Sequence, residues 1–342
     1  MRVGLLGTGA IANKHAQAYR NLGFELAACS NKSEARGREF AARWNCEFVG
    51  DYEALCHSPA LDYVDVCTFP DFHLPPVLAC AEIGRHILLQ KPMATNLDDA
   101  QCILEAAHKA GIVLGVVSQK RFDDPIIFLK RALAAGRLGK LIEADAYVKW
   151  FRSDEYYSRP IKGSWEVEGG GALMNQAIHQ VDLLLYLAGP LERVQAMWQI
   201  GARHRIEAED VVNALLGFRS GITGVIQAST AFWPGYTERI EIHGTKGSAI
   251  VSGDRLTSWD ALNDEEANAA DPAPVEQDAA SGSSDPMAIR LTSFERQFTD
   301  FAAAIRSGRK PLTDGEAGYR ALEAVLAVYT ACRESRFVQL TS

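Results

Sequence analysis

Short apolar runs alternate with segments of helical spacing along the first third of the chain. The runs have the length and composition of buried strands, and they lie at residues 2–6, 25–29, 47–49, 63–67, 86–90 and 113–117. The segments between them that show helical spacing lie at residues 13–21, 33–44, 51–57 and 74–83. Strands that alternate with helices of this length predict a mostly parallel, doubly wound α/β sheet with right-handed crossovers.

The pattern changes after residue 120. Following a predicted helix at residues 125–135, strands with alternating apolar and polar positions are expected at residues 142–151, 193–199, 210–218, 223–231, 239–244 and 247–251. Successive strands without intervening helices favour antiparallel pairing. Helices are predicted at residues 292–307 and 315–334, and residues 260–285, rich in small and acidic residues, are expected to form a flexible surface excursion.

A glycine-rich turn follows the first predicted strand directly. It reads Gly7, Thr8, Gly9, Ala10, Ile11, Ala12. Gly7 allows a tight turn, Gly9 lets the backbone approach a pyrophosphate, and Ala12 lets helix and strand pack closely. The start of the following helix offers free N–H groups to phosphates. The turn therefore predicts a dinucleotide-binding domain of the Rossmann type.

The residue that reads the ribose is expected at the end of the second strand. Ser30, Asn31 and Lys32 stand there, with no carboxylate to bind a 2′-hydroxyl. A hydroxyl, an amide and a cation suit a 2′-phosphate better, which favours NADP over NAD. Glu34 keeps NAD open, and a solvated loop without influence on the cofactor is the alternative.

Two further strand ends should line the same cleft, because ligands bind beyond the carboxyl ends of such strands. The fourth strand ends in Thr68, Phe69, Pro70, Asp71, Phe72, His73, and the fifth in Gln90, Lys91, Pro92. Lys91 is placed like a working residue, although a surface lysine is equally compatible with its position. For His73, capping or packing is favoured over contact with the cofactor.

Residues 168–182 carry the candidate chemistry of the second half. They read Glu-Gly-Gly-Gly-Ala-Leu-Met-Asn-Gln-Ala-Ile-His-Gln-Val-Asp. On a helix, Asn175 and His179 stand four residues apart on one face, behind a glycine hinge. Histidine is the side chain whose unperturbed pKa suits proton transfer near neutrality. A core helix with one satisfied histidine is the alternative.

Composition limits the class of protein. The 342 residues suffice for two domains, and 47% hydrophobic with 23% charged residues is typical of a soluble globular chain. A net charge of −8 argues against general affinity for nucleic acid or anionic membranes. The apolar runs are too short to span a membrane and no signal peptide precedes the first strand, so a cytoplasmic protein is expected. The seven cysteines are scattered without zinc spacing, which predicts free thiols and no metal centre.

These motifs together resemble the family of glucose-fructose oxidoreductase and inositol 2-dehydrogenase over nearly the whole chain. In that family a Lys-Pro dipeptide, usually preceded by Glu, supplies a catalytic lysine, and a glycine-rich turn leads to an Asp-x-x-x-His pair. Lys91-Pro92 matches the first motif, and Asn175 with His179 matches the second. Gln90 and Asn175 depart from the usual Glu and Asp. Because an asparagine side chain cannot take up a proton, His179 must then carry the proton itself or pass it to substrate or water.

The resemblance implies a Rossmann domain over residues 1–120 and an α+β domain over residues 121–342. The second domain would have an open, mainly antiparallel sheet, with the substrate on one face and an oligomer contact on the other. The helix at residues 315–334 would pack back on the nucleotide domain. Residues 118–122, with Gln119 and Arg121, form the expected junction, where Gln119 is a candidate for the cofactor and Arg121 for the substrate.

The segment between the first strand of this domain and the glycine turn is dense in rings and cations. Planar rings stack on sugars and guanidinium groups bind hydroxyls or carboxylates, so substrate recognition is assigned here. A packed surface loop is the alternative for any single residue. The candidates are Arg152, Tyr157 and Trp165, together with the later Tyr236, which could instead lie at an oligomer contact.

The expected function is an NAD(P)-dependent oxidoreductase acting on CH–OH groups of a sugar, polyol or sugar derivative. His179 would exchange the hydroxyl proton, Lys91 would donate a hydrogen bond to the same oxygen, and Asn175 would fix the ring or a neighbouring hydroxyl. A non-catalytic dinucleotide sensor remains an alternative. So does a relative that reduces an imine or double bond, or that cleaves a glycoside by transient oxidation. A homodimer or homotetramer is expected, because the sheet would leave an apolar face to cover.

Overall fold

A computed structural model describes residues 1–159, 161–262 and 290–340 of the chain. It divides into two compact units. The first comprises Met1–Gln119 and Arg290–Tyr319, and the second comprises Lys120–Ile289 and Arg320–Ser342. The chain thus leaves the first unit after Gln119, returns to it at Arg290, and leaves it again after Tyr319.

The first unit is built on a parallel sheet, as the alternation of strands and helices predicted. Among the described residues its strands are β1 (Arg2–Leu6), β2 (Glu25–Ser30), β3 (Glu47–Phe48), β4 (Tyr63–Val66), β5 (His86–Leu89) and β6 (Leu114–Val116). Their order is β3-β2-β1-β4-β5-β6, and every pair of neighbours is parallel. This is the strand order of a dinucleotide-binding fold, and it aligns the carboxyl ends of β1, β4 and β5 at one edge.

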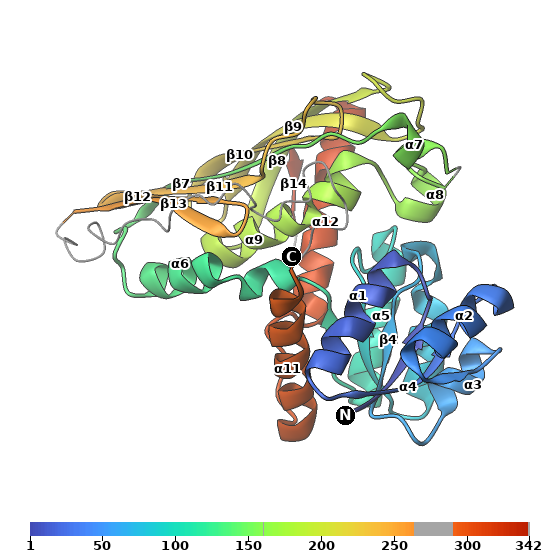
Figure 1. Cartoon of the computed structure of the whole chain (residues 1–342). Coiled ribbons are helices and arrows are strands. Elements are labelled where there is room, and N and C mark those ends of the chain that lie inside the picture. Colours follow the sequence, from blue (N-terminus) through green and yellow to red (C-terminus); the bar gives the residue numbers. More distant parts are fainter. Residues whose placement is uncertain (160, 263–289, 341–342) are drawn as a thin grey trace. The chain divides into compact units, whose positions relative to one another are not determined.

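Helices connect these strands (Figure 1). They are α1 (Ala10–Asn21), α2 (Glu34–Trp44), α3 (Tyr52–His57), α4 (Leu74–Glu82) and α5 (Leu97–Ala110), with the short turns η1 (Pro70–Phe72) and η2 (Gln119–Phe122). α11 (Leu291–Ser307) packs on α1, where the rings of Phe294 and Phe298 lie 5.1 and 4.9 Å from the ring of His15. α5 was not among the predicted helices; it begins at the Asn96 cap and ends at Gly111 in the left-handed conformation.

The second unit is built on a mixed sheet. Among the described residues its strands are β7 (Leu141–Lys149), β8 (Leu191–Ile200), β9 (Glu209–Phe218), β10 (Thr223–Ser229), β11 (Arg239–Gly244), β12 (Gly247–Ser252), β13 (Arg255–Ala261) and β14 (Val338–Gln339). The order is β13-β12-β11-β7-β10-β9-β8-β14. The expected antiparallel pairing holds except between β7 and β10, which are parallel. After β7 the chain forms several helices before it joins the sheet again at β8. The antiparallel strands β8, β9 and β10 then follow one another, and β10 lies next to β7.

Helices line one face of this sheet (Figure 1). They are α6 (Asp124–Ala134), α7 (Asp154–Tyr157), α8 (Trp165–Glu168), the π-helical turn η3 (Ala172–Ala177), α9 (Ile178–Ala188) and α12 (Gly315–Glu334). α9 packs on β7, and α6 packs on β12 and β13. Side chains at alternate positions of β9, such as Val212 and Ala214, are buried on this side, whereas Asn213 and Leu215 are exposed on the other.

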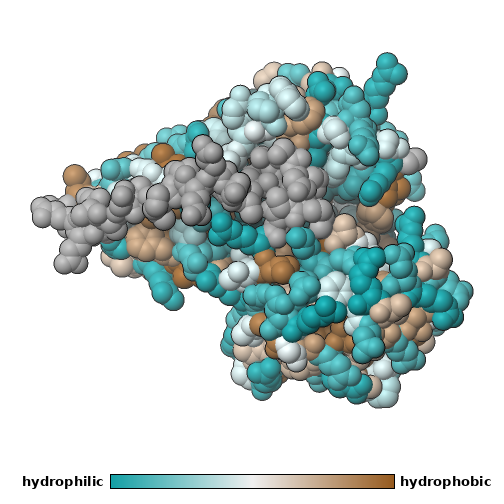
Figure 2. All heavy atoms as spheres, in the orientation of Figure 1, coloured by the Kyte–Doolittle hydropathy of each residue, from teal (hydrophilic) through white to brown (hydrophobic). Residues whose placement is uncertain are grey.

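Part of the predicted acidic excursion is a strand, since β13 extends to Ala261; residues 263–289 lie outside the described residues. On the visible face, hydrophilic residues cover most of the surface and hydrophobic ones form smaller areas between them (Figure 2). Within the described parts of the chain, no helix has the length and apolar composition that crossing a membrane requires.

Candidate active site

The glycine-rich turn joins β1 to α1 and has the shape of a phosphate cradle. Gly7 has φ of +89°, and a Cβ on it would lie 2.8 Å from the carbonyl oxygen of Cys67. A Cβ on Gly9 would meet open space, and Gly9 caps α1 without a side-chain hydrogen bond. The hydroxyl of Thr8 is buried and finds no hydrogen-bond partner among the described residues. An open cradle, an uncapped helix start and a buried hydroxyl fit the pyrophosphate of a dinucleotide.

At the end of β2 and just after it, two side chains are buried or hydrogen-bonded and one cationic side chain is exposed. Ser30 is 2% exposed. Oδ1 of Asn31 accepts from the main-chain N–H of Thr8 at 3.3 Å, while its amide nitrogen donates to the carbonyl of Ser33 at 2.9 Å. Asn31 therefore supports the glycine turn, and Lys32 is the member of this group that faces solvent.

The side chain of His73 holds the loop after β4 through contacts with main-chain oxygens. Its Nδ1 lies 3.1 Å from the carbonyl oxygen of Met93 and its Nε2 lies 3.2 Å from that of Thr68. Burial lowers the pKa of His73 to about 4. Both ring nitrogens face main-chain oxygens, so we place His73 as a clamp between the loops after β4 and β5 rather than at the cofactor.

The same loop presents Phe69 to solvent with 43% of its surface exposed, while Pro70 is buried. Thr68 is half-buried. Gln119, at the start of η2, is 3% exposed. Among Thr68, Phe69, Pro70 and Gln119, which were predicted to contact the cofactor, only Thr68 and Phe69 have side chains that a ligand can reach.

Gln90 and Lys91 follow β5 at the same edge. The main-chain N–H of Gln90 donates to the carbonyl of Val66, which keeps the end of β5 level with that of β4. Gln90 is 6% exposed, whereas Lys91 is half-buried and precedes a cis peptide bond to Pro92. Of these two side chains, that of Lys91 is therefore the more accessible to a ligand.

Behind this edge lie His15, Asp65 and Cys67, residue types that can hold a metal, with ligand atoms within 4.8 Å of one another. Nδ1 of His15 and Oδ2 of Asp65 are 2.7 Å apart. Two atoms that share a tetrahedral zinc ion, each about 2.0 Å from it, would stand roughly 3.3 Å apart. A proton fits between them and a metal does not, so we interpret the group as a buried hydrogen-bond network.

In the second unit a buried carboxylate holds the turn formed by the three glycines. Glu209 accepts from the main-chain N–H of Gly171 at 2.9 Å and of Leu173 at 2.8 Å, and from the hydroxyl of Tyr329 at 2.9 Å. A Cβ on Gly170 would overlap the Tyr329 hydroxyl, and one on Gly171 would overlap the carbonyl of Glu209. Burial raises the pKa of Glu209 to about 7. Glycine is required here because backbone, carboxylate and phenol approach so closely.

Asn175 and His179 follow this turn. Between residues 168 and 184 they are the two described side chains that are not buried. The predicted uninterrupted α-helix was wrong in detail, since Asn175 lies in the π-helical turn η3 and α9 begins at Ile178. Such turns are frequent at functional sites. A buried segment in which one amide and one imidazole stay partly accessible is arranged to present them to a ligand.

Glu168 is a functional candidate that the sequence interpretation missed. Its carboxylate accepts from the amide nitrogen of Asn175 at 2.7 Å, from Nζ of Lys162, and from the main-chain N–H of Gly163 at 2.8 Å. The amide of Gln176, next to Asn175, donates to the hydroxyl of Tyr156 at 3.2 Å. A glutamate before a glycine run is the signal in the sequence, but its partners could not be read from spacing.

The predicted substrate residues fall into different environments. Arg121 is buried in a bidentate pair with Asp182, at 2.8 and 2.6 Å, and lies over the ring of Tyr186, which favours a structural role. Trp165 packs against Trp198 and Tyr329 and donates to the carbonyl of Glu207.

Arg152 is 3% exposed and stacks over the rings of Trp150 and Tyr156. The hydroxyl of Tyr157 lies 2.8 Å from that of Thr230. Tyr236 is 59% exposed. The ring of Tyr156 thus lies next to both Arg152 and the Asn175 region, whereas Tyr236 stays on the surface.

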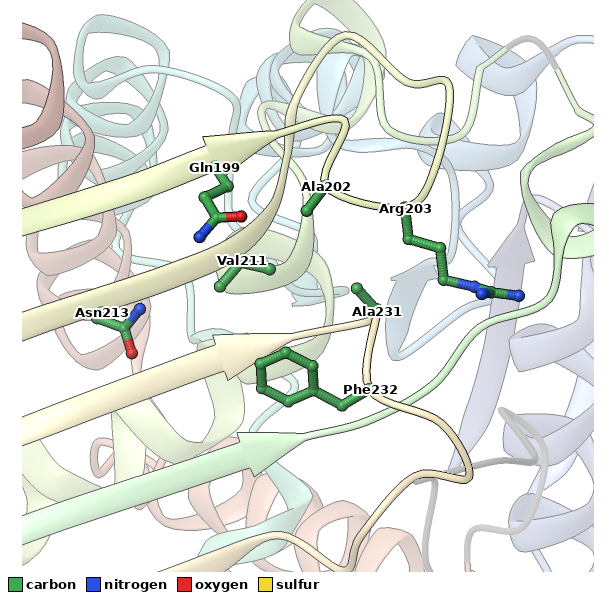
Figure 3. A pocket seen from close by; sticks show the side chains of 7 residues that line it. All are labelled: Gln199, Ala202, Arg203, Val211, Asn213, Ala231 and Phe232. Carbon is green, nitrogen blue, oxygen red and sulfur yellow. The ribbon is translucent and has the colours of Figure 1, made fainter.

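A hollow of about 610 Å³ lies elsewhere in the second unit (Figure 3). Its lining residues come from the ends of β8, β9 and β10 and the loops beyond them; they are Gln199, Ala202, Arg203, Val211, Asn213, Ala231 and Phe232. Val211 and Asn213 share a strand face with the exposed Leu215. The hollow is therefore on the open face of the sheet, and neither Asn175 nor His179 lines it.

Comparison with known proteins decides the family. The model of an oxidoreductase family with an NAD-binding Rossmann fold matches residues 1–118, and that of the GFO/IDH/MocA C-terminal domain matches residues 126–250. The chain is 30% identical to the myo-inositol 2-dehydrogenase of Thermotoga maritima, over 99% of this chain and 98% of that protein. The chain belongs to the GFO/IDH/MocA family.

Other members of the GFO/IDH/MocA family match over similar lengths. The 1,5-anhydro-D-fructose reductase of Ensifer adhaerens is 28% identical over 99% of this chain and 98% of its own. The WlbA dehydrogenase of Bordetella pertussis, solved in complex with NADH and UDP-GlcNAcA, is 29% identical with a TM-score of 0.86, covering 100% of this chain and 99% of that one. The resemblance inferred from Lys91-Pro92 and the glycine-rich stretch is confirmed. So are the two-part fold and the class of NAD(P)-dependent oxidoreductase.

Proposed function

We propose that this GFO/IDH/MocA protein transfers hydride between a nicotinamide dinucleotide and a secondary alcohol or ketone of a sugar, polyol or sugar derivative. The observation that carries the proposal is that Asn175 and His179 are partly accessible while the other side chains of residues 168–184 are buried. A purely structural helix would have no reason to leave an amide and a titratable ring accessible. The relatives named for inositol and anhydrofructose chemistry support the substrate class.

The first unit, Met1–Gln119 with Arg290–Tyr319, is assigned to the dinucleotide, and the second unit to the substrate. Bound NAD(P) supplies or accepts the hydride. Thr8, Gly9 and the start of α1 hold its pyrophosphate, and Thr68 and Phe69 contact its nicotinamide side.

His179 accepts the hydroxyl proton during oxidation and returns it during reduction, because an imidazole changes charge near neutral pH. Lys91 donates a hydrogen bond to the same oxygen and stabilises its developing negative charge. Asn175 accepts a hydrogen bond from a neighbouring hydroxyl through its amide oxygen, since its amide nitrogen faces Glu168 and donates to it.

NADP is favoured over NAD by the residues that follow β2. Lys32 is exposed there, and Glu34, the nearest carboxylate, is paired with Arg38 at 2.8 Å. Lys32→Met should weaken NADPH binding several-fold and leave NADH binding nearly unchanged, measured by nucleotide fluorescence. Equal effects on both nucleotides would remove Lys32 from the recognition of the 2′-phosphate. NADH in the Bordetella pertussis relative is compatible with either preference in this chain.

A homo-oligomer that covers the open face of the second unit's sheet is part of the proposal. Met197 on β8 is 78% exposed and Leu215 on β9 is 56% exposed, and they lie on the face that the helices do not cover. Apolar side chains on a regular sheet face are suited to a second copy of the same face. Mass measurement in solution tests this, with a monomer contradicting it.

The deciding experiment is titration with NADPH and NADH, followed by a panel of inositols, hexoses, anhydrosugars and uronic acids. Nucleotide oxidation or reduction with one of these compounds would establish the activity and exclude a non-catalytic sensor. Binding without turnover would favour the sensor, or a substrate with an imine or double bond. A nucleotide that stays bound through purification and is regenerated in each cycle would favour glycoside cleavage by transient oxidation.

A further inference from the structure

A chain of hydrogen bonds runs through the interior of the first unit from the main chain of Lys91 to Asp65. The N–H of Lys91 donates to Oε1 of Gln90 at 3.0 Å. Nε2 of Gln90 lies 3.0 Å from Nε2 of His15, and Nδ1 of His15 lies 2.7 Å from Oδ2 of Asp65. Its three side chains come from α1, β4 and the residue after β5, and all are buried.

Chemistry fixes the direction of each bond. A main-chain N–H can only donate, so Gln90 must present its oxygen to Lys91. The NH₂ group of Gln90 then faces His15, and because an amide nitrogen also only donates, Nε2 of His15 accepts. The ring proton of His15 is therefore on Nδ1 and points to Asp65. A flipped Gln90 amide would set two donors against each other, leaving a buried N–H unsatisfied.

The far end of the chain is anchored on several sides. Oδ2 of Asp65 also accepts from the hydroxyl of Tyr19 at 2.6 Å, and Oδ1 accepts from the thiol of Cys67 at 3.5 Å. The rings of Phe294 and Phe298 pack against His15. A carboxylate that accepts from three side chains, and an imidazole enclosed by rings, hold one geometry rather than several.

We infer that Gln90, His15 and Asp65 are positioning residues that set the main chain of Lys91, and that glutamine at position 90 holds His15 as the neutral Nδ1–H tautomer. The peptide of Lys91 is thereby held by Gln90, while its side chain, which is half-buried, is the group assigned to the reacting oxygen. The inference rests on the proposed function only for the role of Lys91. The tautomer of His15 is a property of the fold.

Two substitutions separate the two bonds of Gln90. Gln90→Glu keeps an acceptor for the N–H of Lys91, but its carboxylate offers His15 no donor. We therefore expect Nε2 of His15 to take up a proton, which makes the ring a cation between two carboxylates. Gln90→Met keeps the volume of the side chain and loses both bonds. The pair distinguishes a role in holding Lys91 from a role in filling space.

The first test is nuclear magnetic resonance of the full-length protein labelled with ¹⁵N-histidine. The His15 signal is assigned by its loss in His15→Gln or, if that variant does not fold, by its shift in Gln90→Glu. We expect a neutral ring protonated at Nδ1 in the wild type and a doubly protonated ring in Gln90→Glu. A wild-type ring protonated at Nε2 would overturn the inference. This test needs no substrate, so its failure is distinct from failure of the proposed function.

The second test is steady-state kinetics with the substrate found by titration. Gln90→Met should lower kcat by roughly 10- to 100-fold with little change in KM, because a misplaced catalytic group costs rate rather than binding. Gln90→Glu should retain more of kcat than Gln90→Met. Wild-type kcat in Gln90→Met, or equal losses in the two variants, would show that the bond to Lys91 does not position it. Thermal unfolding of each variant confirms that the fold is retained.

Discussion

The side-chain amide nitrogen of Asn175 lies 2.7 Å from Oε1 of Glu168, a carboxylate that is 5% exposed. An ionised carboxylate only accepts, so this contact determines which end of the amide is which. Asn175 directs its oxygen away from Glu168 and thus acts as an acceptor without charge. The negative charge lies instead on Glu168, the hydrogen-bond partner of Asn175, and Lys162 forms an ion pair with it.

Replacing Asn175 with aspartate, the residue usual in the family, is therefore expected to lower stability and activity. Asn175→Asp would place two carboxylates where one donor now meets one acceptor. We expect a loss of roughly 1–3 kcal/mol in the free energy of unfolding, because a buried carboxylate loses a donor and gains a like charge. Denaturant unfolding at pH 8 measures the loss, and kcat should fall in parallel.

The matched control is the exchange of the two groups. Glu168→Gln combined with Asn175→Asp restores one carboxylate and one amide, so the double variant should be more stable than Asn175→Asp alone. Additive losses in the double variant would show that the two side chains are not coupled.

Replacement of Lys91 tests the proposed hydrogen bond to the reacting oxygen. Lys91→Met keeps the length of the side chain and removes its charge, so turnover should fall by at least about 100-fold. Nucleotide affinity, followed by fluorescence, should stay nearly constant. Lys109→Met, on the exposed side of the last turn of α5, is the control and should leave both quantities unchanged. Substantial activity in Lys91→Met would remove this lysine from the mechanism.

Replacement of His179 tests proton transfer. His179→Asn should lower kcat by roughly 100-fold or more and flatten its dependence on pH near neutrality, since asparagine does not titrate. The pH–rate profile is the measurement. His108→Asn, exposed on α5, is the control. A profile of unchanged shape in His179→Asn would assign the histidine a structural role.

The stability of the glycine turn should depend on pH through Glu209. Burial raises the pKa of this group from 4.5 to about 7 in the folded chain. Between these two values the unfolded chain releases the proton first, so stability falls as pH rises. The contribution is complete below about pH 4.5 and lost above about pH 7, a change of roughly 3 kcal/mol.

Glu209→Gln removes this titration. The free energy of unfolding of the variant minus that of the wild type should increase from pH 4.5 to pH 7.5. Any constant offset reports instead the altered bonds to Gly171 and Leu173. Glu207→Gln, two residues away and exposed, is the control for general charge effects. A pH-independent difference for Glu209→Gln would show that Glu209 is ionised throughout this range.

Much of the first unit was predictable because its signals are local. The strand before Gly7, the glycine turn and the helix after it are adjacent in sequence. Each of the three makes the prediction of its neighbours more certain. The strand ends carrying Thr68 and Lys91 followed from parallel topology alone. Asn175 and His179 were predicted as a pair from their four-residue spacing, and both stay partly accessible at the junction of η3 and α9.

The networks behind these residues were not predictable, because they join positions far apart in the chain. His15 meets Gln90 across 75 residues, and Glu209 meets Tyr329 across 120. Neither periodicity nor composition reports such a contact. Arg121 was assigned to the substrate from its charge and place, and only the structure shows its pairing with Asp182. The parallel pairing of β7 with β10 likewise depends on the course of the chain between them.

The first unit draws on two separate stretches, Met1–Gln119 and Arg290–Tyr319. Gln297 in the second stretch donates to the carbonyl of Val116 in the first at 2.9 Å, and the ring of Phe301 lies 5.2 Å from that of Tyr63. A fragment ending near residue 120 would lack both. The second unit likewise draws on two stretches, Lys120–Ile289 and Arg320–Ser342. Exchanging the second unit for that of another protein therefore requires three junctions, near residues 120, 290 and 320.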